Sequence, residues 1–402
     1  MGKNEQIPAI RFQGFTDEWE QCKVGDYLTL SRILGHTGVD AKKLTVKLWA
    51  KGVVEKTDIY GGSENTQYYV RHTGQFMYGK LDFLHAAFGI VPESLNGYES
   101  TLDSPAFDLN GIDGSFLLNR VSQDDFYLKY GTIANGSRKA KRIHEDTFLA
   151  MPIAVPTIEE QKTIGHYFDN LDNLITLHQR KHEKLTNIKK SMLEKMFPRD
   201  GANVPEIRFS GFTDAWEQRK LGEVVKEITR NDPESEAPIM MITANNGFIE
   251  QSERYAFNNA GESLKKYILL KKGELAYNHG ASKLRPYGSC FALTTAENAR
   301  IPFVYHCFSA ENQNAEFMSI ELNGDEIENQ LRKIVSSGAR MDGLLNISFD
   351  EYTSVSVLLP GTEEQDRIAD FFRHLDNLIT LHQHKLEKLK NIKKSMLEKM
   401  FV

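Results

Sequence analysis

Apolar residues recur at alternating steps of four and three along two long stretches of the chain, within residues 156–198 and 360–402. This spacing is typical of the buried seam of a coiled coil. Each stretch opens on a proline, Pro156 or Pro360, and two glutamates follow in the first turn, where the helix dipole favours negative charge. The pattern predicts two long helices of about 40 residues, or roughly 60 Å each at 1.5 Å per residue.

The seam of the first helix is interrupted at Lys189 and continues through Ile188, Met192 and Met196. Met196 lies eleven residues after Leu185, a step that locally relaxes a left-handed supercoil. Because two equal apolar stripes in one chain most simply pack on each other, we expect an antiparallel coiled coil. The predicted seam takes residues from both helices: Ile164, Phe168, Leu171, Ile175, Leu185, Ile188 and Met192, and Ile368, Phe372, Leu375, Ile379, Leu386, Leu389, Ile392 and Met396.

Two phrases occur twice in the chain. Residues 7–25 and 204–222 are identical at 13 of 19 positions and share the run RF-x-GFTD-x-WEQ. Residues 168–198 and 372–402 are identical at 25 of 31 positions. The chain therefore consists of two halves, each with a constant opening segment, a variable region and a constant helix. The period is too long for a solenoid array.

The short linker between the halves constrains their arrangement. Only residues 198–203 separate the end of the first helix from the second opening segment, so these points must lie close together. If a twofold axis relates the halves, the end of the chain at Val402 must likewise lie close to Ile7. We therefore predict a nearly circular molecule with an internal pseudo-twofold axis and neighbouring termini. Its predicted parts are 1–155, 156–198, 199–359 and 360–402.

The variable regions, 26–155 and 223–359, share only a skeleton. Both contain the pattern Gly-x3-Tyr-x10-Gly, around Tyr78 and Tyr277, which indicates a strand that enters a polar loop. Short strands separated by glycines alternate with helical stretches in both regions. This favours an α/β domain of mixed α+β type in each half.

Basic residues cluster locally although the formal net charge is −6. Residues 41–51 carry four lysines and no acid, and four of the five residues in 138–142 are basic. Basic side chains beside tyrosine and asparagine in loops suit phosphate and base contacts. The alternative is that the tyrosines are core residues and the basic runs are solvated surface. The candidates for DNA contact are Tyr78, Lys80, Arg138, Lys139, Arg142, Tyr277, Asn278, Lys283, Arg285 and Arg340.

Other residues invite chemical roles that we do not favour. His178 and His182 have a spacing that can hold a metal, but Leu386 replaces His182 in the second half, so we predict no metal site. Trp19 and Trp216 are identical in both halves, so packing or a partner interface is favoured over base stacking. The three cysteines fit no metal-ligand spacing. The chain has no long apolar run and no secretory signal at its start, so we expect a cytoplasmic protein without membrane contact.

Together, the doubled opening segments, the EEQ helix starts, and the LDNLITLHQ and NIKKSMLEKMF runs resemble the specificity subunit of type I restriction-modification systems. The resemblance covers nearly the whole chain, although the variable regions match only in outline. It implies that residues 1–155 and 199–359 are target-recognition domains, each reading one half of a bipartite site in double-stranded DNA. The helices, 156–198 and 360–402, would set the gap between the half-sites. The resemblance also implies docking of two modification subunits and of motor-nuclease restriction subunits.

The chain carries none of the motifs that the chemistry of such a complex requires. No Pro-Pro pair occurs, which excludes the usual adenine-methyltransferase signatures, and no G-x-x-x-x-G-K-[ST] phosphate loop is present. We therefore expect a non-catalytic chain that binds no cofactor, with S-adenosylmethionine, ATP and Mg bound by partner subunits. The alternative is a coiled-coil scaffold that joins two ligand-binding domains without DNA. An enzyme is the third and least favoured interpretation.

Overall fold

The computed structural model describes residues 7–38, 40–57, 63–132, 142–199, 201–244, 247–254, 261–335 and 344–402. The chain divides into two compact units. Unit 1 contains Met1–Lys181 and His382–Val402, and unit 2 contains His182–Leu381. Both units have mixed α/β structure. The division falls inside the two long helices, so it does not test the predicted domain boundaries, which stay a prediction.

Unit 1 is built on an antiparallel four-stranded sheet in the order β2-β10-β7-β8. These strands are β2 (Leu28–Ser31), β10 (Ala106–Leu109), β7 (Phe76–Tyr78) and β8 (Phe88–Ile90). Every residue of β7 is buried, because both faces of this strand are covered. The predicted strand at Tyr78 is therefore present, but it is apolar on both faces instead of alternating.

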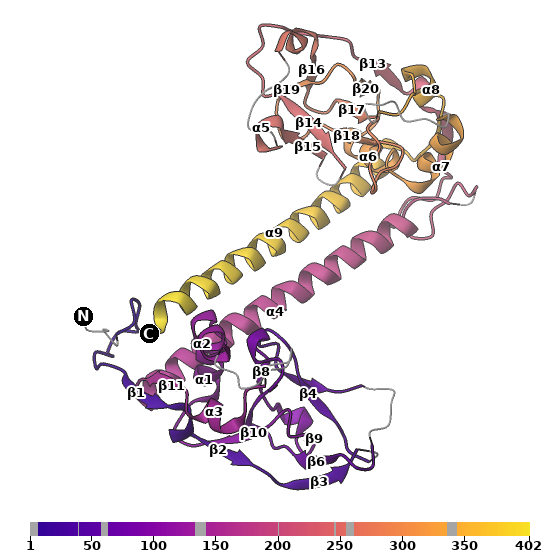
Figure 1. The fold of residues 1–402 in the computed structure, drawn as a ribbon. Coiled ribbons are helices and arrows are strands. Elements are labelled where there is room, and N and C mark those ends of the chain that lie inside the picture. The colour runs from indigo at the N-terminus through magenta and orange to yellow at the C-terminus, as the bar shows by residue number, and fades with distance from the viewer. Residues whose placement is uncertain are drawn as a thin grey trace. The chain divides into compact units, whose positions relative to one another are not determined.

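Smaller sheets and short helices surround this sheet in unit 1 (Figure 1). Strand β1 (Glu20–Lys23) pairs with β11 (Pro152–Val155), and β4 (Leu44–Val46) pairs with β5 (Val53–Glu55). A three-stranded sheet has β6 (Gln67–Val70) between β3 (Leu34–Thr37) and β9 (Glu99–Ser100). The helices are α1 (Gly114–Val121), α2 (Asp124–Gly131) and α3 (Glu145–Leu149), with 3-10 turns η1 (Val24–Asp26), η2 (Phe83–His85) and η3 (Glu93–Leu95).

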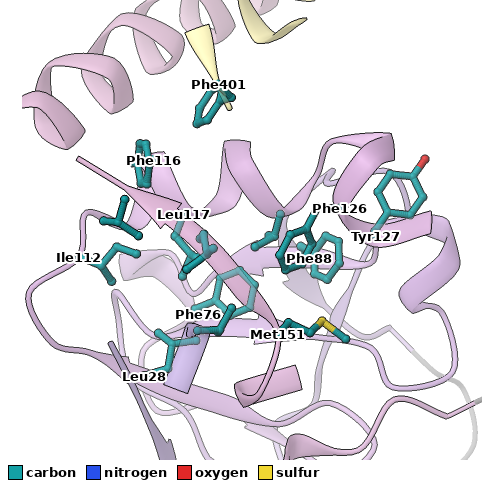
Figure 2. Close-up of a cluster of buried hydrophobic side chains, with 14 of the residues drawn as sticks. Leu28, Phe76, Phe88, Ile112, Phe116, Leu117, Phe126, Tyr127, Met151 and Phe401 are labelled. Atoms are coloured by element: carbon teal, nitrogen blue, oxygen red, sulfur yellow. The ribbon is translucent and has the colours of Figure 1, made fainter. Parts of the chain in front are cut away.

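The core of unit 1 includes the end of the chain. Figure 2 shows Phe401 beside Phe116, above the buried layer of Phe76, Phe88 and Leu117. The rings of Phe116 and Phe401 are 5.5 Å apart. The last residues of the chain therefore belong to the same hydrophobic core as strands near its beginning.

Unit 2 repeats this plan. Its four-stranded sheet has the order β13-β20-β17-β18, and β12 pairs with β21 as β1 pairs with β11. The strands are β12 (Glu217–Lys220), β13 (Val225–Glu227), β14 (Met240–Thr243), β15 (Gly247–Glu250), β16 (Ile268–Lys271), β17 (Leu275–Asn278), β18 (Ser289–Ala292), β19 (Asn298–Ile301), β20 (His306–Ala310) and β21 (Ser356–Leu359). The helices are η4 (Leu221–Glu223), α5 (Gln251–Arg254), η5 (Gly261–Lys266), α6 (Ala315–Glu321), α7 (Asp325–Ile334) and α8 (Phe349–Thr353).

The two predicted long helices are present. They are α4 (Ile158–Lys195), of 38 residues, and α9 (Thr362–Met400), of 39 residues. In unit 1 Phe168 of α4 lies near Phe401 and Asp172 near Lys393 of α9, so the two helices run antiparallel there. In unit 2 Lys189 lies near Asp376 and Phe197 near Phe372, so they run antiparallel there too. All of the predicted seam residues are buried or half-buried. Their pairing in one coiled-coil seam stays a prediction.

Candidate nucleic-acid interface

The same buried ion pair anchors the opening segment in each half. The guanidinium of Arg11 donates two hydrogen bonds to Glu160, both of 2.6 Å, and Arg208 donates two of 2.7 Å to Glu364. The carboxylate side chains are 0% and 1% exposed. Hydrogen bonding to the carboxylate raises the pKa of both arginines above its usual value, although burial opposes the shift. Because a bidentate pair is directional, it fixes each opening segment against the first turn of its helix.

The glutamine of each EEQ motif makes a second constant contact. The side chain of Gln161 accepts a hydrogen bond from the Asp113 amide before α1 and donates one to the Pro156 carbonyl. Gln365 makes the equivalent bonds with Asn314 and Pro360. Sequence reasoning used this motif only as a helix start. Its identity in both halves was the signal that its side chains also bind the neighbouring domain.

Each opening segment also contacts the end of a long helix within its own unit. The Ile10 amide donates to the Lys399 carbonyl in unit 1, and the Ile207 amide donates to the Lys195 carbonyl in unit 2, both at 2.9 Å. Trp19 packs edge-on against Phe401, and Trp216 packs likewise against Phe197. These contacts place the chain end near the first opening segment, as predicted. Packing, not base stacking, is the role of both tryptophans in this structure.

A charged contact between the two long helices also occurs once in each half. Lys189, which interrupts the predicted seam, lies 2.5 Å from Asp376, and its counterpart Lys393 lies 2.6 Å from Asp172. The interruption therefore accommodates a cross-helix ion pair.

His178 contacts a histidine of the other long helix. Its Nδ1 lies 2.8 Å from Nδ1 of His382, the equivalent residue of the second half. Within the described ranges, no three histidine, cysteine, aspartate or glutamate side chains gather in a way that suits a metal ion.

The structure corrects the prediction that two tyrosines contact DNA, because both side chains lie in the core. Tyr78 is 0% exposed and its hydroxyl donates to the Ile143 carbonyl, while Tyr277 is 1% exposed and donates to the Tyr287 carbonyl. Burial raises the pKa of both phenols above its usual value. The alternative of two core tyrosines, each with a partnered hydroxyl, describes them correctly.

The structure also corrects the prediction that Lys80 contacts DNA. It is 6% exposed and its Nζ lies 2.8 Å from Glu145. Burial disfavours the Glu145 carboxylate, but the hydrogen bonds from Lys80 and from the backbone, together with the charges of Lys80 and Arg32, outweigh it and the pKa of Glu145 is lowered. The lysine therefore holds α3 against the central sheet and is not available to a phosphate.

The remaining candidates for DNA contact differ in how exposed their side chains are. Lys283 is exposed, and Arg142 is exposed with a contact of 3.4 Å to Asp103. Asn278 is half-buried and donates to the Ile242 carbonyl, and Arg285 donates to the Asn323 carbonyl. Arg138, Lys139 and Arg340 lie outside the described residues. DNA contact by Arg142 and Lys283 stays a prediction.

A cavity of about 870 Å³ lies within unit 2, between the last turns of α4, the segment 201–203, α6 and the part of α9 near Asp376. Its lining mixes basic residues such as Arg199 with acidic ones such as Glu316. A polyanion selects surfaces of one sign of charge, so this cavity does not suit a DNA backbone. Trp216 lines it, and the indole Nε1 of this tryptophan has no hydrogen-bond partner.

Sequence reasoning missed a set of exposed leucines on the long helices. Leu174 and Leu177 of α4 are 43% and 45% exposed, and the equivalent Leu378 and Leu381 of α9 are 43% and 46% exposed. These leucines belong to the run LDNLITLHQ that both halves share. In the sequence, these leucines stand at positions outside the predicted seam, and this was the signal that could have identified an exposed apolar surface.

Comparisons with known proteins agree on one family. Residues 117–187 match a family profile described as the type I restriction modification DNA specificity domain. The chain is 24% identical over 309 residues to the type I restriction enzyme MjaVIII specificity subunit of Methanocaldococcus jannaschii, covering 71% of this chain and 69% of that protein. It shares its fold with the type I restriction-modification S subunit from M. genitalium, at a TM-score of 0.52 and 13% identity over 98% and 99% of the two chains. No helix in the described ranges has the length and apolar character needed to cross a membrane.

Proposed function

We infer that this chain is a DNA specificity subunit of the type I restriction-modification class. The observation that carries this inference is the match of residues 117–187 to the specificity domain of that family. The matched residues run from α1 through much of α4, so they join a target-recognition region to its long helix. The curated relative and the shared fold support the same assignment.

Each half of the chain is proposed to read one half of a bipartite DNA site. The target-recognition domains are residues 1–155 and 199–359, and the helices 156–198 and 360–402 are proposed to set the gap between the half-sites. Arg11 with Glu160 and Arg208 with Glu364 make the same contact within each half, which supports two equivalent modules. Equivalent modules suit a protein that must contact DNA at two separated positions.

The exposed leucines of the long helices are proposed to bind the modification subunits. Leu174 and Leu177 in one half correspond to Leu378 and Leu381 in the other, so each half offers the same apolar surface. Two copies of one partner can then bind equivalently. Restriction subunits that carry the motor and nuclease are the further partners of such a complex.

The chain is proposed to recognise DNA without catalysing a reaction. In that case S-adenosylmethionine is bound by the modification subunits, and ATP and Mg are bound by the restriction subunits. The sequence supports this division, because it contains neither a methyltransferase signature nor a phosphate loop.

A genome-wide map of methyladenine tests the proposal. Cells would express the chain with its modification subunit, once unchanged and once with residues 26–155 replaced by the variable region of another such protein. We expect a split motif in which the swap changes one half alone. Complete assembly without methylation, or one uninterrupted motif that the swap leaves unchanged, contradicts the proposal and supports a scaffold without DNA.

A further inference from the structure

We propose that Trp49, at the tip of the β4–β5 hairpin, enters a groove of the first half-site, wedges open a base step and stacks on the bases that this exposes. This inference rests on the proposed DNA-reading function and adds a specificity-determining residue to it. The candidates drawn from the sequence pattern do not include this tryptophan.

The exposure of Trp49 is not explained by the fold of unit 1. Its side chain stands 55% exposed, whereas Trp19 and Trp216 are 1% and 2% exposed. Large aromatic side chains are normally well covered in a folded domain. Leu48, its neighbour at the tip, is also 38% exposed. The hairpin therefore presents an apolar tip for which the described residues of unit 1 provide no cover.

The tip is held in an uncommon backbone conformation. Trp49 and Ala50 have φ angles of 60° and 49°, in the left-handed region that side chains with a Cβ seldom adopt. The Trp49 amide donates to the His85 carbonyl and the Ala50 amide to the Ala86 carbonyl, both at 2.7 Å. Such strain persists where surrounding contacts impose it, and it is common at ligand-contact sites. The backbone that carries the indole is thus held in place by the loop beside it.

The charge around the tip suits DNA. Lys42, Lys47 and Lys51 are exposed, and the run 41–51 contains no acidic residue. A two-stranded β-ribbon fits the major groove of DNA, and lysines beside it neutralise phosphates. An aromatic ring can stack on the bases of a duplex where a base step is opened.

The hairpin also lies against the loop that follows β7. Residues 79–87 follow β7 and supply His85, whose ring is 5.6 Å from that of Trp49. In this loop Lys80 is buried, whereas Leu81 is 40% exposed and the side chain of His85 is 54% exposed. The loop and the hairpin tip therefore form one surface, on which Trp49 is the largest exposed side chain.

The test measures DNA binding by the complete complex of the chain with its modification subunits. The probes are duplexes that carry the site mapped by methyladenine, intact or with either half scrambled. Trp49→Gly is the principal variant, because glycine adopts a positive φ without strain and the thermal midpoint should not fall. We expect about a tenfold to hundredfold weaker binding to the intact site, and unchanged binding when the first half-site is scrambled. Trp49→Phe keeps a ring that can stack and should retain most of the affinity.

Salt dependence separates stacking from charge. Trp49→Gly should leave the slope of log K against log salt unchanged, whereas each of Lys47→Ala and Lys51→Ala should lower it by about one. Leu128→Ala removes another exposed apolar side chain of unit 1, 44% exposed on α2, and should change nothing.

Three outcomes overturn the role of Trp49. They are wild-type affinity and selectivity in Trp49→Gly, an equal loss in Leu128→Ala, or loss of the modification subunits from the Trp49→Gly complex, which would identify a protein contact. A wild-type complex that does not select the mapped site contradicts the proposed function itself, so the two failures are distinguishable.

Discussion

The two halves of this chain keep the same anchors around different cores. Both fasten the opening segment with a buried arginine-glutamate pair, and both place a tyrosine on the central strand of the sheet. The hydroxyl of Tyr78 reaches the carbonyl of Ile143, 65 residues away, whereas that of Tyr277 reaches Tyr287, 10 residues away. The comparison teaches that the residues around the sheet differ between the two halves, whereas the contacts that attach each unit to its long helices are the same.

One position shows how far the divergence extends. Arg120, near the end of α1, pairs with Asp125, while Glu321 occupies the corresponding end of α6, is 8% exposed and accepts a hydrogen bond from the Leu358 amide. A basic side chain in the first half thus corresponds to an acidic side chain in the second half. The constant contacts do not involve either side chain, so the exchange is tolerated.

Removal of an anchoring arginine should have the largest effect. Arg11→Ala leaves the buried Glu160 without its partner, and Arg208→Ala does the same to Glu364. We expect a loss of about 3–5 kcal/mol in the free energy of unfolding of the unit that carries the change. Hydrogen-deuterium exchange, followed separately for peptides of units 1 and 2, measures it.

The matched control removes both charges of one anchor, as in Arg11→Met with Glu160→Met, and should cost far less. An equal loss in the single and double variants would mean that the pair acts through its packing alone.

A pH titration should separate the two units next. Burial raises the pKa of Glu321 from 4.5 to about 7, so the folded state holds its proton more tightly than the unfolded state. The stability of unit 2 should therefore decrease by about 3 kcal/mol as the pH rises from 4.5 to 7. Urea unfolding at several pH values measures this, and Glu321→Gln should abolish this contribution. Unit 1 carries Arg120 in place of this carboxyl group and serves as the comparison.

Removal of the core tyrosine hydroxyls should have a smaller effect. Tyr78→Phe and Tyr277→Phe each leave a backbone carbonyl without its donor, and we expect a loss of about 1–2 kcal/mol in unfolding free energy. Because both side chains are buried, DNA affinity should be unchanged in a binding titration. A selective loss of one half-site in either variant, at unchanged stability, would restore that tyrosine as a DNA contact.

The cross-helix ion pairs should contribute least. Asp172→Asn and Asp376→Asn each remove one partially exposed pair, and we expect less than about 1 kcal/mol from either, decreasing further at high salt. Thermal unfolding at low and high salt measures the change. A much greater effect in one half than in the other would show that the repeated pairs are not equivalent.

The sequence by itself determined the parts of this protein that repeat locally. The three-and-four spacing of apolar residues predicted both long helices, which are present, because helical periodicity is a property of neighbouring residues. The duplicated segments predicted two equivalent halves, and with them the contact between the chain end and the first opening segment.

Only the tertiary structure decided which polar and aromatic residues face solvent. Tyr78, Tyr277 and Lys80 were predicted to contact DNA, yet they are buried by chain segments far away in sequence, such as α3 and the residues around Ile143. Tryptophan is a residue type that is usually well covered, yet Trp49 is exposed because the β4–β5 hairpin is held against residues 85 and 86. Exposure depends on long-range packing, which no local pattern of residues records.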